Sequence, residues 1–234
     1  MIPLDERIIF ALDVADAAAA IRLVDRLQGR IRLFKIGMQL FYGTGWQVVD
    51  YIVNNGGKVM LDLKLYDIPA TVQLAMEQLA GHGVSLTTVH AVGPVVEAAL
   101  AADTGIKILA VTVLTSLGEE ELRTFDFPGS VEELVLARAD MALGCGCHGL
   151  VCSALEAKAL RRRFGQGFSL VTPGIRPSGT STDDQQRVAT PAHAINSGVD
   201  HLVIGRPIRD AADPVAAVTA IEQEIRTALP NQEV

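Results

Sequence analysis

The stretch DLKLYDIP, residues 62 to 69, places Lys64 between Asp62 and Asp67 directly after an apolar run. Side chains alternate along a strand, so Asp62 and Lys64 are expected on one face and the neighbouring leucines on the other. Lys35 lies inside a second apolar run, and Asp13 ends the first. Ionisable groups gathered at strand ends predict a proton-relay site, with a purely structural network of ion pairs as the alternative.

Two arginine-bearing segments follow the last two apolar runs. Arg176 lies in TPGIRPSG, and Arg206 follows Gly205 in IGRPI. In a barrel these are the loops that commonly bind phosphate, and arginine suits phosphate because its N–H donors are paired. Either loop alone is ordinary, but both together predict a phosphorylated ligand. Gln185, in the polar stretch TSTDDQQR, could reach the same ligand as a neutral hydrogen-bonding group.

Other polar residues give weaker signals. Thr115 and Ser116 follow the fifth apolar run, where hydroxyl groups suit a ring with amide edges, although a packing role fits them equally well. His90 ends the fourth run and receives no role. Cys145 and Cys147 are expected to be small packing residues rather than metal ligands, because no second cysteine pair exists to complete a site.

Apolar, β-branched runs recur along the chain, beginning near residues 8, 32, 57, 85, 106, 148, 168 and 201. Their near-continuous hydrophobicity predicts strands buried on both faces, and the segments between them carry helical periodicity. Asp16, Ser130, Ser153 and Asp213 mark helix starts. With no linker and no break in composition, the pattern predicts one α/β domain over residues 1–234, a single (β/α)8 TIM barrel. An open doubly wound sheet is the alternative.

The chain carries 27 acidic and 20 basic residues, a net charge of −7. No basic run is longer than Arg161 to Arg163, which argues against a nucleic-acid surface. The N-terminus lacks the pattern of a signal peptide, and no window approaches the ~18 apolar residues of a spanning helix. We therefore expect a cytoplasmic protein with neither nucleic acid nor membrane as a partner.

The order and spacing of several motifs resemble the bacterial type of orotidine 5′-phosphate decarboxylase, from about residue 7 to residue 225: FALD, FKIG, DLKLYDIPATV, VTVLTS, PGIRPSG with DDQQR, and IGRPI. The resemblance implies decarboxylation of orotidine 5′-monophosphate to uridine 5′-monophosphate in pyrimidine biosynthesis, without cofactor or metal. It implies that Lys64 protonates the ring carbanion and that Asp62 lies near the departing carboxylate. It also places Lys35 on the ribose and the carboxylate pair, and Asp13 on a ribose hydroxyl.

The same resemblance implies a homodimer. Asp67, a further catalytic group, and Thr71 would complete the site of the neighbouring subunit. Thr115 and Ser116 would contact the pyrimidine edge. The other substrate-binding residues that the resemblance implies, most of them around the phosphate, are Ile68, Pro173, Arg176, Gln185, Gly205 and Arg206.

Other functions stay open on the sequence. 3-Keto-L-gulonate 6-phosphate decarboxylase and its relatives share the barrel and an Asp-x-Lys-x-x-Asp motif but use a magnesium ion. A Schiff-base aldolase could use Lys35 or Lys64, although an amine flanked by carboxylates is a poor nucleophile. A phosphate-ligand binding protein with a structural charge network would bind nucleotide without turnover.

Overall fold

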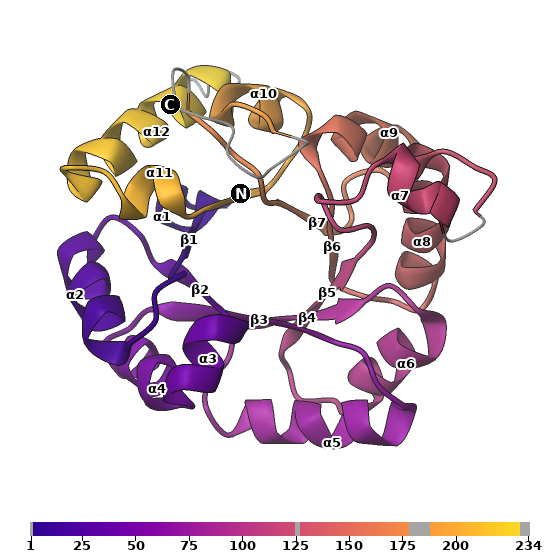
Figure 1. The fold of residues 1–234 in the computed structure, drawn as a ribbon, viewed down its shortest axis with the longest axis horizontal. Coiled ribbons are helices and arrows are strands. Elements are labelled where there is room, and N and C mark those ends of the chain that lie inside the picture. The colour runs from indigo at the N-terminus through magenta and orange to yellow at the C-terminus, as the bar shows by residue number, and fades with distance from the viewer. Residues whose placement is uncertain (1, 125–126, 178–187, 230–234) are drawn as a thin grey trace.

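The computed structural model describes residues 2–124, 127–177 and 188–229. Its parallel strands form a closed barrel in chain order, and β8 pairs with β1 to complete it (Figure 1). The predicted (β/α)8 barrel is therefore confirmed, and the open sheet is wrong. The strands are β1 Ile8–Ala11, β2 Leu33–Gly37, β3 Lys58–Leu65, β4 Leu86–His90, β5 Lys107–Val111, β6 Gly149–Val151, β7 Ser169–Thr172 and β8 His201–Ile204.

Helices surround the barrel as an outer ring (Figure 1). Every connection between consecutive strands contains helical structure, as the periodicity predicts, and α1, α3, α7 and α11 are short additions to that pattern. None of the helices within the described ranges has both the length and the apolar composition that crossing a membrane requires. The helices are α1 Leu4–Arg7, α2 Ala17–Leu27, α3 Met38–Thr44, α4 Gln47–Asn54, α5 Pro69–Ala80, α6 Gly93–Ala101, α7 Glu119–Thr124, α8 Val131–Gly144, α9 Ala154–Phe164, α10 Pro191–Asn196, α11 Arg206–Arg209 and α12 Pro214–Ala228.

Side chains at the helix starts satisfy the first backbone N–H groups, as the sequence predicts. Asp16 accepts a hydrogen bond from the N–H of Ala19 at 2.8 Å, and the Asp213 side chain caps α12 in a similar way. Ser130 and Ser153 open α8 and α9 with complete capping boxes. These local contacts fix where each helix begins relative to the strand before it.

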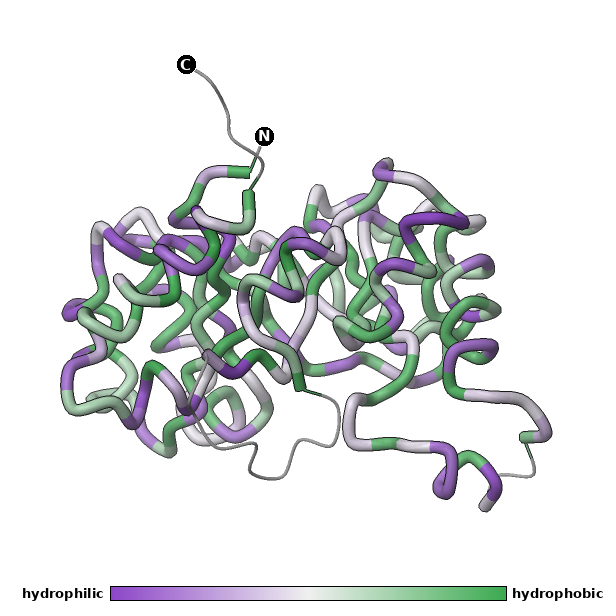
Figure 2. Tube along the Cα trace, turned by 90° about the horizontal axis from the view of Figure 1, so that it is seen from above, coloured by the Kyte–Doolittle hydropathy of each residue, from purple (hydrophilic) through white to green (hydrophobic). Residues whose placement is uncertain are grey.

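Two apolar layers hold the barrel together. The larger layer lies between strands and helices. In Figure 2, green hydrophobic segments run through the centre of the molecule, while purple hydrophilic residues lie mostly on the outer helices. The smaller layer fills the barrel interior with Ile9, Ala11, Leu33, Met60, Leu86, Leu109, Val111, Val151, Val171 and Val203. Because these side chains close the barrel, charged groups at the strand ends line a pocket with an apolar floor.

Candidate active site

A cavity of about 240 Å³ opens at the carboxyl ends of the strands. Its apolar floor includes Met60, Val111 and Val203 of the interior layer. The sequence-predicted residues that line it are Asp13, Lys35, Asp62, Lys64, Thr115, Pro173, Arg176, Gly205 and Arg206. A single chain thus brings the charged motif and both arginine-bearing segments to one pocket.

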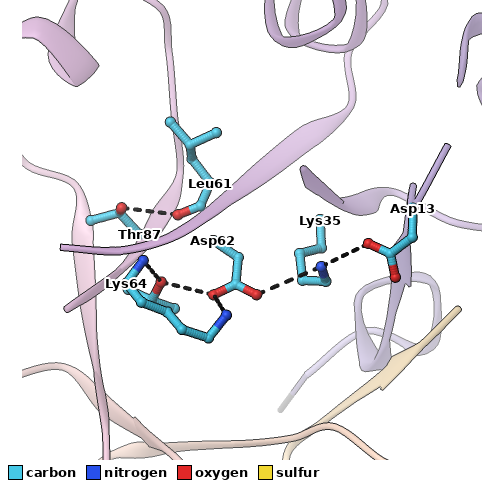
Figure 3. Close-up of polar contacts among 7 residues, drawn as sticks. Asp13, Lys35, Leu61, Asp62, Lys64 and Thr87 are labelled. Carbon is cyan, nitrogen blue, oxygen red and sulfur yellow. Dashed lines mark hydrogen bonds and ion pairs between the residues drawn. The ribbon is translucent and has the colours of Figure 1, made fainter. Parts of the chain in front are cut away.

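Four of these lining side chains, alternately acidic and basic, follow one another in a line (Figure 3). The Nζ atom of Lys35 lies 3.2 Å from Asp13 Oδ1 and 3.6 Å from Asp62 Oδ2. The Nζ atom of Lys64 lies 3.0 Å from the other oxygen of Asp62, Oδ1. Asp62 therefore has a cation on each side. We call these four residues, Asp13, Lys35, Asp62 and Lys64, the charged array.

The carboxyl group of Asp62 lies among buried groups, because Asp62 and its neighbour Lys35 are each only 9% exposed. Burial alone would raise its pKa, since a carboxylate is poorly solvated inside a protein. The ammonium groups of Lys35 and Lys64 outweigh that effect, and the pKa of Asp62 lies below its ordinary value. Asp62 is consequently an anion at neutral pH.

Strand β3 reaches the site in an irregular conformation that simple alternation of side chains does not predict. Its register against β4 shifts between Leu61 and Leu65, and Lys64 adopts a left-handed backbone with a φ of 51°. Asp62 and Lys64 nevertheless both line the cavity, as predicted, while Leu63 and Leu65 pack against the helix-side layer. A left-handed lysine is uncommon and persists only where surrounding contacts hold it.

Thr88 in β4 provides such contacts and has no role in the sequence-based prediction. Its hydroxyl donates to Asp62 Oδ1 at 2.9 Å and accepts from the backbone N–H of Lys64 at 2.9 Å. Thr88 is fully buried and is not among the residues that line the cavity. The available signal was its position two residues before His90, as a polar residue inside an apolar strand.

Two glycines leave room for the charged array where neighbouring strands end. A Cβ atom on Gly37 would lie 3.1 Å from Lys35 Nζ, and one on Gly205 would lie 3.3 Å from Asp13 Oδ2. Both distances are tighter than ordinary contacts, so a side chain at either position would press on a charged group. These close approaches give a physical reason for the glycines in FKIG and IGRPI.

Arg176 and Arg206 form a cationic wall of the same cavity. Arg176 follows β7 and is only 8% exposed, and its Nη1 donates to the carbonyl of Ile175 at 3.0 Å. Its backbone N–H donates to the carbonyl of Ala189 at 2.9 Å, which ties this loop to the segment before α10. Arg206 begins α11 directly after Gly205. The loops after β7 and β8 are where barrels commonly bind phosphate.

A second arginine of α11, Arg209, connects this wall to the end of β1, and the sequence pattern gave no sign of it. Its Nη1 donates to the backbone carbonyl of Asp13 at 2.7 Å. Its other nitrogens form a two-point ion pair with Asp210 at 2.6 and 2.8 Å. The backbone that carries Asp13 is thereby attached to the helix that carries Arg206.

Some predicted residues lie away from the cavity. Asp67, Ile68 and Thr71 are exposed on the segment after β3 and on the first turn of α5. The Asp67 carboxylate accepts from the N–H of Ile68 at 2.6 Å. Ser116 is also exposed and is not among the lining residues, although the residue before it is. Gln185 lies outside the described residues.

Of the two cysteines expected to be packing residues, Cys147 is buried, whereas Cys145 is only partly buried. Cys147 is buried, which raises the pKa of its thiol to about 11, and its Sγ donates to the carbonyl of Gly149 at 3.4 Å. His148 Nδ1 accepts from the N–H of Ile108 at 3.1 Å. In the part of the chain that the structure describes, no group of three or more His, Cys, Asp or Glu side chains is placed to hold a metal ion.

These features define a (β/α)8-barrel enzyme whose site lies at the carboxyl ends of its strands. The family model described as "Orotidine 5'-phosphate decarboxylase / HUMPS family" matches residues 6–221. The chain belongs to this family, and the resemblance drawn from its motifs is confirmed.

Relatives named orotidine 5′-phosphate decarboxylase match over nearly their whole length. That of Afipia carboxidovorans is 48% identical over 225 residues, covering 95% of this chain and 96% of the relative. That of Methylococcus capsulatus is 44% identical over 227 residues, covering 96% and 94%. A crystal structure of orotidine 5′-phosphate decarboxylase from Lactobacillus acidophilus aligns with a TM-score of 0.83 at 36% identity, covering 94% of this chain and 99% of that one.

The lowered pKa of Asp62 predicts a specific dependence of stability on pH. A carboxyl group whose pKa is lower in the folded than in the unfolded protein stabilises the folded state at pH values above its unfolded pKa of about 3.9. This stabilisation is lost as the pH falls through the pKa of the folded state. The difference in unfolding free energy between the native protein and Asp62→Asn should therefore shrink on acidification from pH 6 toward pH 2. Urea unfolding across this range measures it.

Asp140→Asn removes an exposed carboxylate on α8, away from the charged array, and controls for the loss of one negative charge. A difference between native protein and Asp62→Asn that stays constant with pH would contradict the assigned ionisation of Asp62.

Proposed function

We propose that the chain decarboxylates orotidine 5′-monophosphate to uridine 5′-monophosphate in pyrimidine biosynthesis, with Lys64 as proton donor and without metal or cofactor. The observation that carries the proposal is the meeting of the charged array and the arginine wall in one cavity. The names of the relatives supply the reaction. The proposal takes residues 1–234 as one barrel domain acting in the cytoplasm, with neither nucleic acid nor membrane as a partner.

The two ends of the cavity suit the two ends of this substrate. Arg176 and Arg206 would receive the phosphate, and Asp13 and Lys35 would receive the ribose. The orotate ring would then lie over the apolar floor with its carboxylate toward Asp62 and Lys64. Thr115, which lines the cavity, is suited to the amide edge of the ring. Pro173 and Gly205 shape the phosphate end, and Ser116 and Gln185 complete the proposed substrate contacts.

The chemistry requires a cation beside the reacting carbon. When the bond to the carboxylate breaks, carbon dioxide leaves and the electron pair stays on the ring carbon. The ammonium group of Lys64 stabilises that charge and then gives it a proton, after which solvent restores the proton to the amine. General acid catalysis contributes only ~10²–10⁴-fold, so electrostatic stabilisation by the preorganised array must contribute more.

Asp62 has two effects in this mechanism. Its negative charge holds the ammonium group of Lys64 at 3.0 Å, in a fixed place beside the substrate. The same charge opposes the approach of the substrate carboxylate, and the opposition disappears when carbon dioxide leaves. Binding energy from the distant phosphate can offset that cost, because contacts remote from the reacting carbon help to bring substrate into the site.

The exposed segment after β3 supports the homodimer in this proposal. Tyr66 is 68% exposed and Ile68 is 66% exposed, which is unusual for large apolar side chains so close to a site. Asp67 and Thr71 are exposed on the same segment. In the proposed dimer this segment covers the mouth of the neighbouring barrel, where Asp67 joins the partner's charged array and Ile68 and Thr71 contact its substrate.

Loss of ultraviolet absorbance of orotidine 5′-monophosphate, measured in EDTA, tests the reaction and the role of Lys64. Native protein should consume the substrate, and Lys64→Ala should slow it by roughly 10⁴-fold or more, because charge stabilisation and protonation are lost together. Lys58→Ala is a matched control on the same strand: its Nζ pairs with Glu6 at 2.7 Å, away from the array. Full turnover by Lys64→Ala, or turnover that requires added magnesium, would overturn the proposal.

Mixed dimers test whether Asp67 acts in the neighbouring subunit. Lys64→Ala and Asp67→Ala should each be nearly inactive alone. Random mixing of the two makes half of the dimers hybrid, and each hybrid has one site with both native residues, so about one quarter of native activity should return. If Asp67 serves its own chain instead, no mixed site is complete and no activity returns.

A further inference from the structure

The hydroxyl group of Thr88 makes two hydrogen bonds, and both partners belong to the charged array. A threonine hydroxyl has a single proton to donate. That proton goes to Asp62 Oδ1 at 2.9 Å, and the oxygen accepts from the backbone N–H of Lys64 at 2.9 Å. Because the residue is fully buried, water cannot replace either partner.

The bond to Lys64 compensates for an interruption in the sheet. Leu61 pairs with Thr87 in regular register, and regular pairing resumes only at Leu65 with Val89. Within this interval, the hydroxyl oxygen of Thr88 accepts the hydrogen bond from the N–H of Lys64 that a backbone carbonyl of β4 would accept in a regular sheet. The left-handed backbone of Lys64 thus has a partner on β4 that depends on one side chain.

The bond to Asp62 sets the rotation of its carboxylate. Oδ1 receives both the Thr88 hydroxyl at 2.9 Å and the Lys64 ammonium group at 3.0 Å. Oδ2 is then left to face Lys35 at 3.6 Å. A carboxylate free to rotate would not hold the two cations in these fixed places.

We propose that Thr88 is a positioning residue for the decarboxylation, one that fixes Lys64 and Asp62 together without touching the substrate. This inference rests on the proposed function and deepens it by adding β4 to the strands that build the reacting end of the site. Thr88 acts through both the backbone of the proton donor and the carboxylate that holds it.

Thr87 offers a matched control on the same strand. It is also fully buried, and its hydroxyl donates to the backbone carbonyl of Leu61 at 3.0 Å. Thr87→Val and Thr88→Val each remove one buried hydroxyl and keep the shape of the side chain. Only the second change touches the charged array, so a general loss of packing would affect both variants alike.

Steady-state kinetics with orotidine 5′-monophosphate compares native protein, Thr88→Val, Thr88→Ser and Thr87→Val. Thr88→Val should lower kcat by roughly 10- to 100-fold, the value of a hydrogen bond to a charged group, with a smaller change in KM. Thr88→Ser keeps the hydroxyl and should restore kcat, and Thr87→Val should retain it. Native kcat in Thr88→Val, or no recovery in Thr88→Ser, would overturn the proposal. If Thr88→Val does not fold, Thr88→Ala takes its place.

A titration that needs no turnover separates this inference from the proposed function. Carbon-13 NMR of labelled aspartate carboxyl groups, with Asp62→Asn for assignment, follows the ionisation of Asp62. Loss of the Thr88 bond, one of the interactions that lower the pKa of Asp62, should raise that pKa in Thr88→Val and leave it unchanged in Thr87→Val. An unchanged Asp62 titration in Thr88→Val would overturn the inference. An inactive native protein with this shift present would refute only the proposed reaction.

Discussion

The site depends on one buried anion held between two cations. Asp62 is removed from water at the carboxyl end of β3, and this costs free energy unless opposite charges and hydrogen bonds compensate it. Lys35, Lys64 and Thr88 supply that compensation from three consecutive strands. Loss of any one partner would weaken that compensation for the buried carboxylate. The charged array is therefore a unit whose members cannot be exchanged independently.

The barrel explains how such a unit can be assembled. Strand ends that lie far apart in the sequence meet at one mouth, and the interior layer closes the space beneath them. Gly37 and Gly205 then leave room for the charged side chains between neighbouring strands. Arg209 hydrogen-bonds to the backbone of Asp13 from α11, the helix that also carries Arg206. This contact links the arginine wall to the charged array.

Regular features of the molecule could be predicted from the sequence. Continuous apolar runs gave the strands, because a parallel sheet is buried on both faces. Asp16, Ser130 and Ser153 gave helix starts, because capping depends on residues close together in the chain. The motif residues at strand ends were found for a related reason, since parallel strands place their carboxyl ends at one edge.

Features that depend on neighbouring strands could not be predicted in this way. The left-handed backbone of Lys64 arises from a register shift against β4, and periodicity along β3 alone carries no sign of it. Thr88 looks like an ordinary strand threonine until the strand beside it is known. Ser116 and Thr115 were both expected at the site. Because side chains in a loop do not alternate regularly, the sequence could not show that Thr115 lines the cavity while Ser116 is exposed.

The central claim is that phosphate binding by the arginine wall supports decarboxylation at the charged array of the same cavity. The most direct test measures kcat/KM of native protein and Arg206→Ala with orotidine 5′-monophosphate and with orotidine, which lacks the phosphate. The account predicts a loss of roughly 100-fold or more for the phosphorylated substrate and little change for orotidine, because only the first can use the arginine. Equal effects on both substrates, or none on either, would contradict it.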